Sequence, residues 1–172
     1  MSQTRQTPLV GILMGSDSDL PVMAEAAKTL KEFSIPFEIE VTSAHRSPAR
    51  TGEYARTARE RGLKVIIAGA GGAAHLAGVV ASETTLPVIG VPIDSSPLAG
   101  LDALLATAQM PGGVPVATMA VGKAGAANAG ILAAQIIGVH DPRIAQALAA
   151  FKERQARSVA EKNEKMKREF PL

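Results

Sequence analysis

The chain has 172 residues, of which 47% are apolar and only 3% are aromatic, so its core must be built mainly from Ala, Val, Ile and Leu. A formal net charge of +2 gives no reason to expect a nucleic-acid partner, and the absence of cysteine excludes disulfides, thiolate metal ligands and cysteine nucleophiles. No stretch is long and apolar enough to predict a membrane partner, and the N-terminus lacks the apolar segment of a signal peptide. We therefore expect a cytoplasmic protein with a single domain over residues 1–172.

The first half of the chain alternates strand and helix patterns. The apolar run 8–14 predicts a buried strand, and Asp19 and Pro21 mark the start of a helix that reaches about residue 33. A second strand is expected at 37–42, followed by a charged helix at 48–61 that ends before Gly62.

The second half continues the alternation. Strands are expected at 64–72, 87–93 and 114–121, and helices at 75–84, 100–110 and 124–139. Five strand–helix pairs in succession predict an α/β fold with a doubly wound, mostly parallel sheet and right-handed crossovers. We expect residues 1–7 to form a flexible tail, residues 8–140 the core, and residues 141–172 a helical extension.

Charge is distributed very unevenly along the chain. Residues 65–140 contain only four charged side chains, whereas residues 141–172 contain 13. The helix expected at 124–138 has no polar face, because only Asn128 and Gln135 interrupt it, and such a helix is typically buried on all sides. We therefore predict a homo-oligomer whose subunits meet along the second half of the chain; the alternative is a helix lying across the sheet of a monomer. The mixed-charge segment 151–170 predicts a solvated helix that embraces a neighbour or projects.

The loops that follow the five strands contain most of the polar residues of interest. In order, they read "MGSDSD", "TSAHRSP", "AGAGGAAH", "VPIDSSP" and "AVGKAGA". Ligands of open parallel sheets bind at the carboxyl ends of the strands, so these loops are expected to form one site.

The first of these loops is suited to anion binding. Ser16, Ser18 and backbone N–H groups at a helix start can hold a negative charge, although Ser18 or Asp19 could simply cap the helix. Reading Asp17 and Asp19 as the Asp-x-Asp pair of a magnesium phosphotransferase is disfavoured, because Gly15 and Ser16 separate them from the strand.

Several familiar motifs match poorly. The segment "GAGGAA" fits a dinucleotide fingerprint but follows the third strand, so we interpret its glycines as allowing close approach of a small ligand. "AVGKAG" lacks the residues of a phosphate-binding P-loop, and Gly-x-Ser-x-Gly is absent. The three histidines, His45, His75 and His140, are scattered along the sequence, so we expect no metal site.

The segment "SAHR" is the best candidate for chemistry. His45 can donate or accept a proton near neutral pH, Arg46 can pair with a phosphate or carboxylate, and Ser43 adds a neutral hydrogen bond. A single histidine at a strand end is more often structural. Because His45 is flanked by Ser and Arg and faces a second anion-binding loop, we favour the functional interpretation.

Six motifs in succession resemble one family. "MGSDSD", "SAHR", "AGAGGAAHLAG", "PVIGVP", "QMPGGVPVAT" and "GKAGAANA" follow one another as in the N5-carboxyaminoimidazole ribonucleotide mutases of de novo purine (IMP) biosynthesis. The resemblance extends from about residue 9 to residue 140, and the loop "GGAAH" is similar to the mutase class rather than the carboxylase class. One departure is Ala77, where the family usually has Pro.

The resemblance implies a fold and an assembly. It implies a flavodoxin-like three-layer αβα sandwich with a five-stranded parallel sheet, extended here by a C-terminal helix. It also implies a homo-octamer with active sites at subunit junctions, and a reaction on a small-molecule ribonucleotide without a metal or organic cofactor.

The resemblance also implies residue roles. Ser16 and Arg46, with Ser18 nearby, would hold the 5′-phosphate, Asp19 would hold the ribose hydroxyls, and His45 would be the general acid and base. The pocket for the base and the carboxylate would be lined by Ser43, Ala70, Gly71, Gly72, His75 and Leu76. His75 could be catalytic or structural, and His140 is expected to be structural.

Three other functions stay open at this stage. A direct carboxylase of aminoimidazole ribonucleotide would use the same loops. A non-catalytic flavodoxin-like module that binds a nucleotide or flavin would need the fold only, although the 3% aromatic content disfavours flavin stacking. A structural assembly protein would explain the apolar second half but not five polar strand-end loops.

Overall fold

The protein is described here from a computed structural model that covers residues 7–171. Its centre is a parallel sheet of five strands, β1 (Val10–Met14), β2 (Phe37–Val41), β3 (Val65–Gly71), β4 (Val88–Ile93) and β5 (Ala117–Thr118). Their order is β2-β1-β3-β4-β5, the flavodoxin-like order, so the predicted fold is confirmed. The predicted tail at 1–7 lies outside the described residues except for Thr7.

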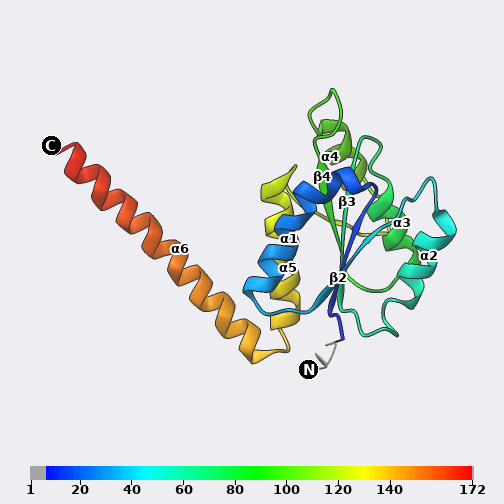
Figure 1. Cartoon of the computed structure of the whole chain (residues 1–172), viewed down its shortest axis with the longest axis horizontal. Coiled ribbons are helices and arrows are strands. Elements are labelled where there is room, and N and C mark those ends of the chain that lie inside the picture. The colour runs from blue at the N-terminus through cyan, green and yellow to red at the C-terminus, as the bar shows by residue number, and fades with distance from the viewer. Residues whose placement is uncertain (1–6, 172) are drawn as a thin grey trace.

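Helices cover both faces of the sheet (Figure 1). On one face, α1 (Leu20–Glu32) and α5 (Lys123–Gly138) pack over a core cluster that includes Ile12, Ile67 and Ile89. On the other face lie α2 (Pro48–Thr57) and α3 (Leu76–Glu83), over a cluster that includes Leu13 and Ile66. Because neighbouring residues of a strand point to opposite faces, the continuous apolar runs of the inner strands fill both layers.

Some predicted boundaries were wrong. The fifth strand has two residues instead of the predicted 114–121. Pro115, which has no N–H to donate to a strand ladder, accounts for the loss of its N-terminal part. Helix α2 ends at Thr57 instead of residue 61, and the chain then turns toward Gly62, which has a φ of +97°. Helix α4 (Leu101–Ala108) is also slightly shorter than predicted and packs against β4 and β5.

The composition of helix α5 (Lys123–Gly138) predicted burial on all sides, but within one chain only part of the helix is buried. Its small residues pack closely on α1, and a Cβ added at Gly130 would lie 2.8 Å from Cβ of Thr29. Asn128, Gln135 and Val139 are exposed. The helix therefore occupies the outer layer of the sandwich, and its exposed residues are available for the contact between subunits that the sequence predicts.

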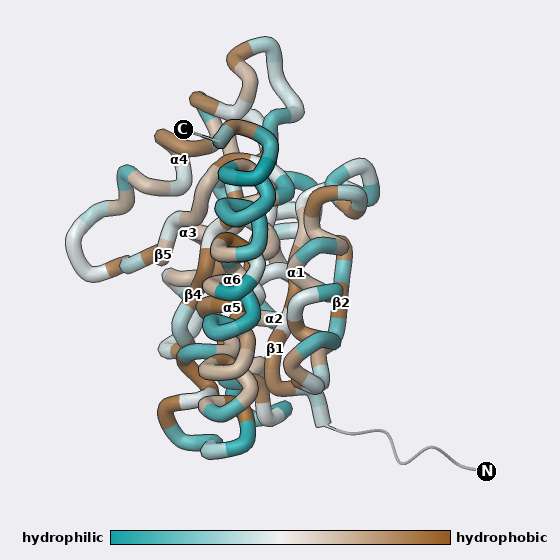
Figure 2. Tube along the Cα trace, turned by 90° about the vertical axis from the view of Figure 1, so that its left-hand side faces the viewer, coloured by the Kyte–Doolittle hydropathy of each residue, from teal (hydrophilic) through white to brown (hydrophobic). Residues whose placement is uncertain are grey.

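The C-terminal extension is a single helix, α6 (Pro142–Glu169), of 28 residues. Its first turns pack on the body, where Ile144 is buried and the rings of Phe151 and Phe33 meet edge to face at 5.5 Å. Beyond Arg154, which pairs with Glu32, the helix projects away from the body and is largely hydrophilic (Figures 1 and 2). In residues 7–171, no helix has both the length and the apolar character needed to cross a membrane.

Candidate active site

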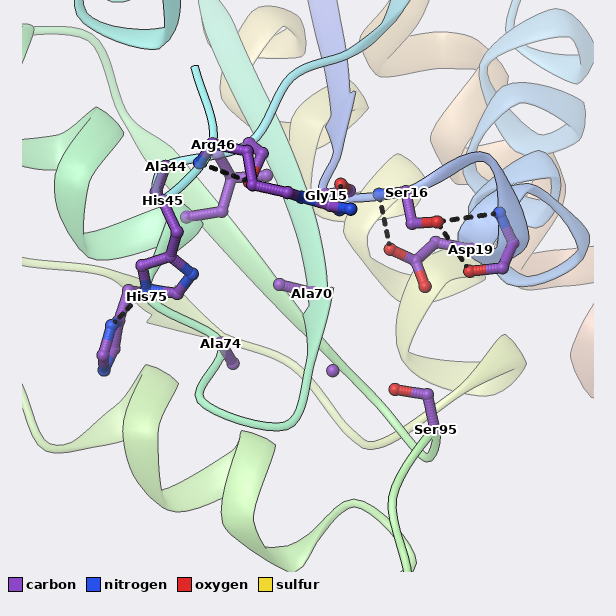
Figure 3. A pocket seen from close by; sticks show the side chains of 14 residues that line it. Gly15, Ser16, Asp19, Ala44, His45, Arg46, Ala70, Ala74, His75 and Ser95 are labelled. Atoms are coloured by element: carbon purple, nitrogen blue, oxygen red, sulfur yellow. Dashed lines mark hydrogen bonds between the residues drawn. The ribbon is translucent and has the colours of Figure 1, made fainter. Parts of the chain in front are cut away.

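A cavity of about 370 Å³ opens at the carboxyl ends of the strands (Figure 3). The loops after β1 and β2, the end of β3 with its following turn, and the loop after β4 all contribute to it. Four of the five predicted loops therefore converge, whereas the loop "AVGKAGA" after β5 contributes no lining residue. Its lining residues are Gly15, Ser16, Ser18, Asp19, Ser43, Ala44, His45, Arg46, Ala70, Gly71, Ala74, His75, Leu76 and Ser95.

The loop after β1 is closed by a reciprocal pair of hydrogen bonds. The backbone N–H of Ser16 donates to Asp19 Oδ2 at 3.1 Å, and the N–H of Ser18 donates to Ser16 Oγ at 3.3 Å. The capping hydroxyl is therefore that of Ser16, on the short 3₁₀ turn η1 (Asp17–Asp19), whereas the sequence suggested Ser18 or Asp19. This turn places Ser16, Ser18 and the carboxyl of Asp19 on one rim of the cavity.

Asp19 is only 6% exposed. Burial raises its pKa above the ordinary value of 3.8, while the hydrogen bond from the N–H of Ser16 opposes this effect. The neighbouring charge of Asp17 adds to the rise. Asp19 is therefore a buried acceptor at the cavity, and its charge is costly unless a ligand or the backbone satisfies it.

Arg46 joins the loops after β2 and β1. Its Nη2 donates to the carbonyl oxygen of Gly15 at 3.1 Å, so its guanidinium lies beside Ser16 (Figure 3). Because a guanidinium has five donors, this single contact leaves others for an anion. Arg46 and Ser16, which are 30 residues apart in the sequence, therefore meet at one end of the cavity, as predicted.

At the other end, two histidine rings meet. His45 Nε2 lies 2.8 Å from His75 Nδ1, and the ring planes are inclined at 75° with centroids 4.9 Å apart. His75 reaches this position because it is the residue that precedes α3. The three histidines are far apart in the sequence, but the fold brings His45 and His75 into contact. Residues 7–171 contain no cluster of three potential metal ligands.

Small residues form the floor of the cavity. A Cβ at Gly71 would collide with Ser95 Oγ and would lie 3.0 Å from Ser95 Cβ, so glycine allows the turn after β3 to approach the loop after β4 closely. Gly72 was predicted to line the cavity but does not. Its φ of +60° allows the turn that follows β3. Ala74 also has a positive φ, of 35°, which is uncommon for a residue with a side chain.

Sequence reasoning missed four of the lining residues: Gly15, Ala44, Ala74 and Ser95. Ser95 belongs to the polar loop "VPIDSSP", which was singled out without a choice among its residues. That choice depends on how close the loop comes to Gly71, which only the folded backbone decides.

Comparison with known proteins agrees with this geometry. A family model described as AIR carboxylase matches residues 9–158. The chain belongs to the AIR carboxylase family. Two relatives, both named N5-carboxyaminoimidazole ribonucleotide mutase, come from Thermotoga maritima and Bacillus subtilis. The first is 60% identical, with 92% of each chain covered, and the second is 57% identical, with 92% of this chain and 98% of the relative covered.

The fold of this chain is also similar to that of a solved structure. The crystal structure of Treponema denticola PurE superposes with a TM-score of 0.84 at 31% identity, covering 93% of this chain and 99% of the other. The family match includes all the loops that line the cavity and reaches residue 158, within α6. The cavity at the carboxyl ends of the strands is therefore the candidate active site of this family member.

Proposed function

We propose that this protein is an N5-carboxyaminoimidazole ribonucleotide mutase. The observation that supports it most directly is the placement of His45 in the same cavity as the anion-binding group Arg46, with relatives of that name at 55–60% identity. Such an enzyme moves a carboxylate from the exocyclic nitrogen N5 to ring carbon C4 of an aminoimidazole ribonucleotide. The product is 4-carboxy-5-aminoimidazole ribonucleotide, an intermediate of purine (IMP) biosynthesis.

The substrate would lie along the cavity from the arginine to the histidines. Arg46 and Ser16 would bind the 5′-phosphate, because a guanidinium and a hydroxyl both suit its oxygens. The carboxylate of Asp19 would accept hydrogen bonds from the ribose hydroxyls, which would satisfy its buried charge. The base and the carboxylate would then lie against the other predicted residues that line the cavity, Ser43, Ala70, Gly71, His75 and Leu76.

His45 would carry out both proton transfers. As an imidazolium it gives a proton to N5, the C–N bond of the carbamate breaks, and carbon dioxide and neutral aminoimidazole ribonucleotide remain. Carbon C4 then attacks the carbon dioxide, and neutral His45 removes the proton from C4, which restores the aromatic ring. The proton count of His45 returns to its starting value, so one histidine is sufficient.

His75 would hold the ring of His45 during this cycle. In the structure the Nε2 of His45 faces His75, and its other ring nitrogen lies on the side toward Ala70 (Figure 3). A ring fixed at one nitrogen presents the other to the substrate in a constant direction, which favours proton transfer. We propose a positioning role for His75 and leave the proton transfers to His45.

Carbon dioxide must be recaptured before it escapes. A cavity floor of alanine and glycine leaves a small space beside the base. Carbon dioxide held in that space would react with C4 at an effectively intramolecular rate. Recapture would therefore depend on how tightly the turn after β3 fits against Ser95.

The experiment compares two substrates in separate assays. N5-carboxyaminoimidazole ribonucleotide should be converted without added bicarbonate, whereas aminoimidazole ribonucleotide with bicarbonate should not react at a comparable rate. Both assays are repeated with a chelator, and no effect is expected. Faster conversion of aminoimidazole ribonucleotide with bicarbonate would instead make the protein a direct carboxylase.

A pair of histidine variants tests the assigned acid and base. H45N should reduce kcat about a thousandfold, since general acid–base catalysis typically contributes 10²–10⁴. H140N is the matched control, because His140 is exposed at the junction of α5 and α6 and outside the cavity. Near-normal turnover of H45N would refute the role of His45 but not the reaction itself.

We also propose a homo-octamer with active sites at subunit junctions, formed by a single-domain chain in the cytoplasm. Leu98, Leu101 and Leu105 are about half exposed or more, in the charge-poor half of the chain, which supports association through this region. Light scattering after size exclusion should give eight times the chain mass of 17.7 kDa. A monomer mass would refute the octamer.

A further inference from the structure

Two buried threonines lie beneath the loop that carries His45 and Arg46. Thr42 directly follows β2, and Thr51 lies in the first turns of α2; they are 3% and 0% exposed. Their hydroxyl oxygens are 2.8 Å apart. Neither residue lines the cavity, so neither has a role in the mechanism described above.

The hydrogen bonds of these hydroxyls form a directed chain. Thr51 Oγ1 donates to the carbonyl oxygen of Ser47 at 3.2 Å. A hydroxyl has a single proton, so Thr42 must be the donor in its bond with Thr51. The chain therefore runs from the end of β2, through α2, to Ser47 at the last position of the loop.

Ser47 extends this chain into the loop. Its Oγ accepts from the N–H of Ser43 at 3.0 Å and donates to the carbonyl oxygen of Ser43 at 3.1 Å. The Oγ of Ser43 in turn accepts from the N–H of Arg46 at 3.1 Å. Hydroxyls thus fix the backbone on both sides of His45.

The side chain of Ser47 makes these bonds instead of the usual bond that caps a helix. It occupies the N-cap position of α2, where a serine side chain usually accepts from an N–H of the first turn. Here the side chain makes no capping bond and turns back to the loop. The hydroxyl of Ser47 therefore stabilises the conformation of the loop rather than the start of α2.

We infer that Thr51, acting through Thr42 and Ser47, is a positioning residue that holds His45 and Arg46 in their places at the cavity. The inference deepens the proposed function and rests on it, because the loop matters for turnover only if these two side chains act on the substrate. Loss of the Thr51 hydroxyl removes the 2.8 Å bond of the buried Thr42 hydroxyl and leaves it only the longer contact of 3.5 Å with Ser47 Oγ, so the loop shifts or loosens.

The test uses T51V, which keeps the shape of the side chain and removes its hydroxyl. With N5-carboxyaminoimidazole ribonucleotide as substrate, we expect kcat to fall about tenfold to a hundredfold, the range typical of a small misplacement of catalytic groups. KM should rise as well, because Arg46 moves with the loop. T51S keeps the hydroxyl and should restore both values to within about twofold.

T107V is a closely matched control. Thr107 is 3% exposed, lies on a helix, and donates to the carbonyl four residues earlier, as Thr51 does, but it is remote from the loop. A loss of folded protein alone would lower kcat and leave KM unchanged. Unchanged kcat and KM in T51V, or equal losses in T51V and T107V, would overturn the inference.

A second measurement does not depend on turnover. Amide hydrogen exchange of the peptide 42–47 should be faster in T51V than in wild type and T51S, because the N–H groups of Ser43 and Arg46 are donors in this network. Unchanged exchange would refute the positioning role even if the wild type had no mutase activity. Absence of activity in the wild type would refute the proposed function alone.

Discussion

The Nε2 of His45 lies 2.8 Å from the Nδ1 of His75, across 30 residues of sequence. A bond of this length needs one donor and one acceptor, so the two rings hold a single proton between the facing nitrogens. Two fully protonated rings would lose the bond. The pair therefore restricts the direction of the His45 ring.

Removing the hydrogen bond between His45 and His75 should impair catalysis more than substrate binding. H75F keeps an aromatic ring but has no hydrogen-bonding nitrogen, and we expect kcat to fall about tenfold with little change in KM, less than the loss from H45N. H75N retains a polar group at this position and should keep more of the activity than H75F. Steady-state kinetics of the two variants beside H140N would check this, and equal kcat in H75F and wild type would show that His75 is dispensable.

Arg46 should contribute mainly to substrate affinity. R46A removes a charge-assisted contact worth about 1.5–3 kcal/mol, so KM should rise about tenfold to a hundredfold. R46K keeps the charge without the planar fork and should be intermediate.

The matched control for R46A is R50A. Arg50 is on the same segment, but it is exposed and pairs with Glu40 outside the cavity. Surface pairs of this kind contribute little, so R50A should keep a normal KM. A KM increase of equal size in R46A and R50A would indicate a general loss of positive charge rather than a specific contact with phosphate.

The fit between Gly71 and Ser95 predicts a pair of compensating substitutions. G71A should lower the free energy of unfolding by about 1–3 kcal/mol and reduce turnover, because the added methyl collides with Ser95 Oγ at the cavity floor. S95G in the G71A background should recover part of both losses. Denaturant unfolding and kinetics of the two single variants and the double variant would give the coupling between the positions.

Gly112 supplies the control for this pair. A Cβ added there meets nothing within 4 Å, so G112A should have little effect on either quantity. Independent, additive effects of G71A and S95G would contradict the proposed steric contact.

The buried carboxyl of Asp19 predicts a pH-dependent difference in stability. Burial raises its pKa above 3.8, so the folded state binds more protons than the unfolded state between 3.8 and the folded-state pKa. The contribution of Asp19 to stability therefore falls as the pH rises through that interval, and D19N lacks this loss because its amide is neutral.

We expect the thermal midpoint of D19N to equal or exceed that of wild type at pH 7, and the difference to shrink as the pH approaches 4. D19N should nevertheless have a higher KM, because an amide is a weaker acceptor for ribose hydroxyls. E153Q, at an exposed position on α6, should show no such pH dependence. A D19N midpoint below that of wild type at pH 7 would mean that the hydrogen bond from Ser16 outweighs the cost of burial.

The sequence by itself determined the order of elements and the family. Short apolar runs that alternate with helical patterns are typical of the inner strands of a parallel sheet. Ligands of such sheets bind at the carboxyl ends of the strands, which is why the loops with Ser16, His45 and His75 were chosen as candidates. The motif order was specific enough to identify the family, which the comparisons confirm. These inferences succeed because they depend on local pattern.

Only the tertiary structure decided which side chains touch. The contacts of His45 with His75, of Gly71 with Ser95 and of Thr42 with Thr51 each join residues from different elements. Their distances depend on how those elements pack, to within an ångström, and no periodicity in the sequence records that. For the same reason Ser47 looks like an ordinary helix cap in the sequence, and the folded chain instead places its hydroxyl against the loop that carries His45.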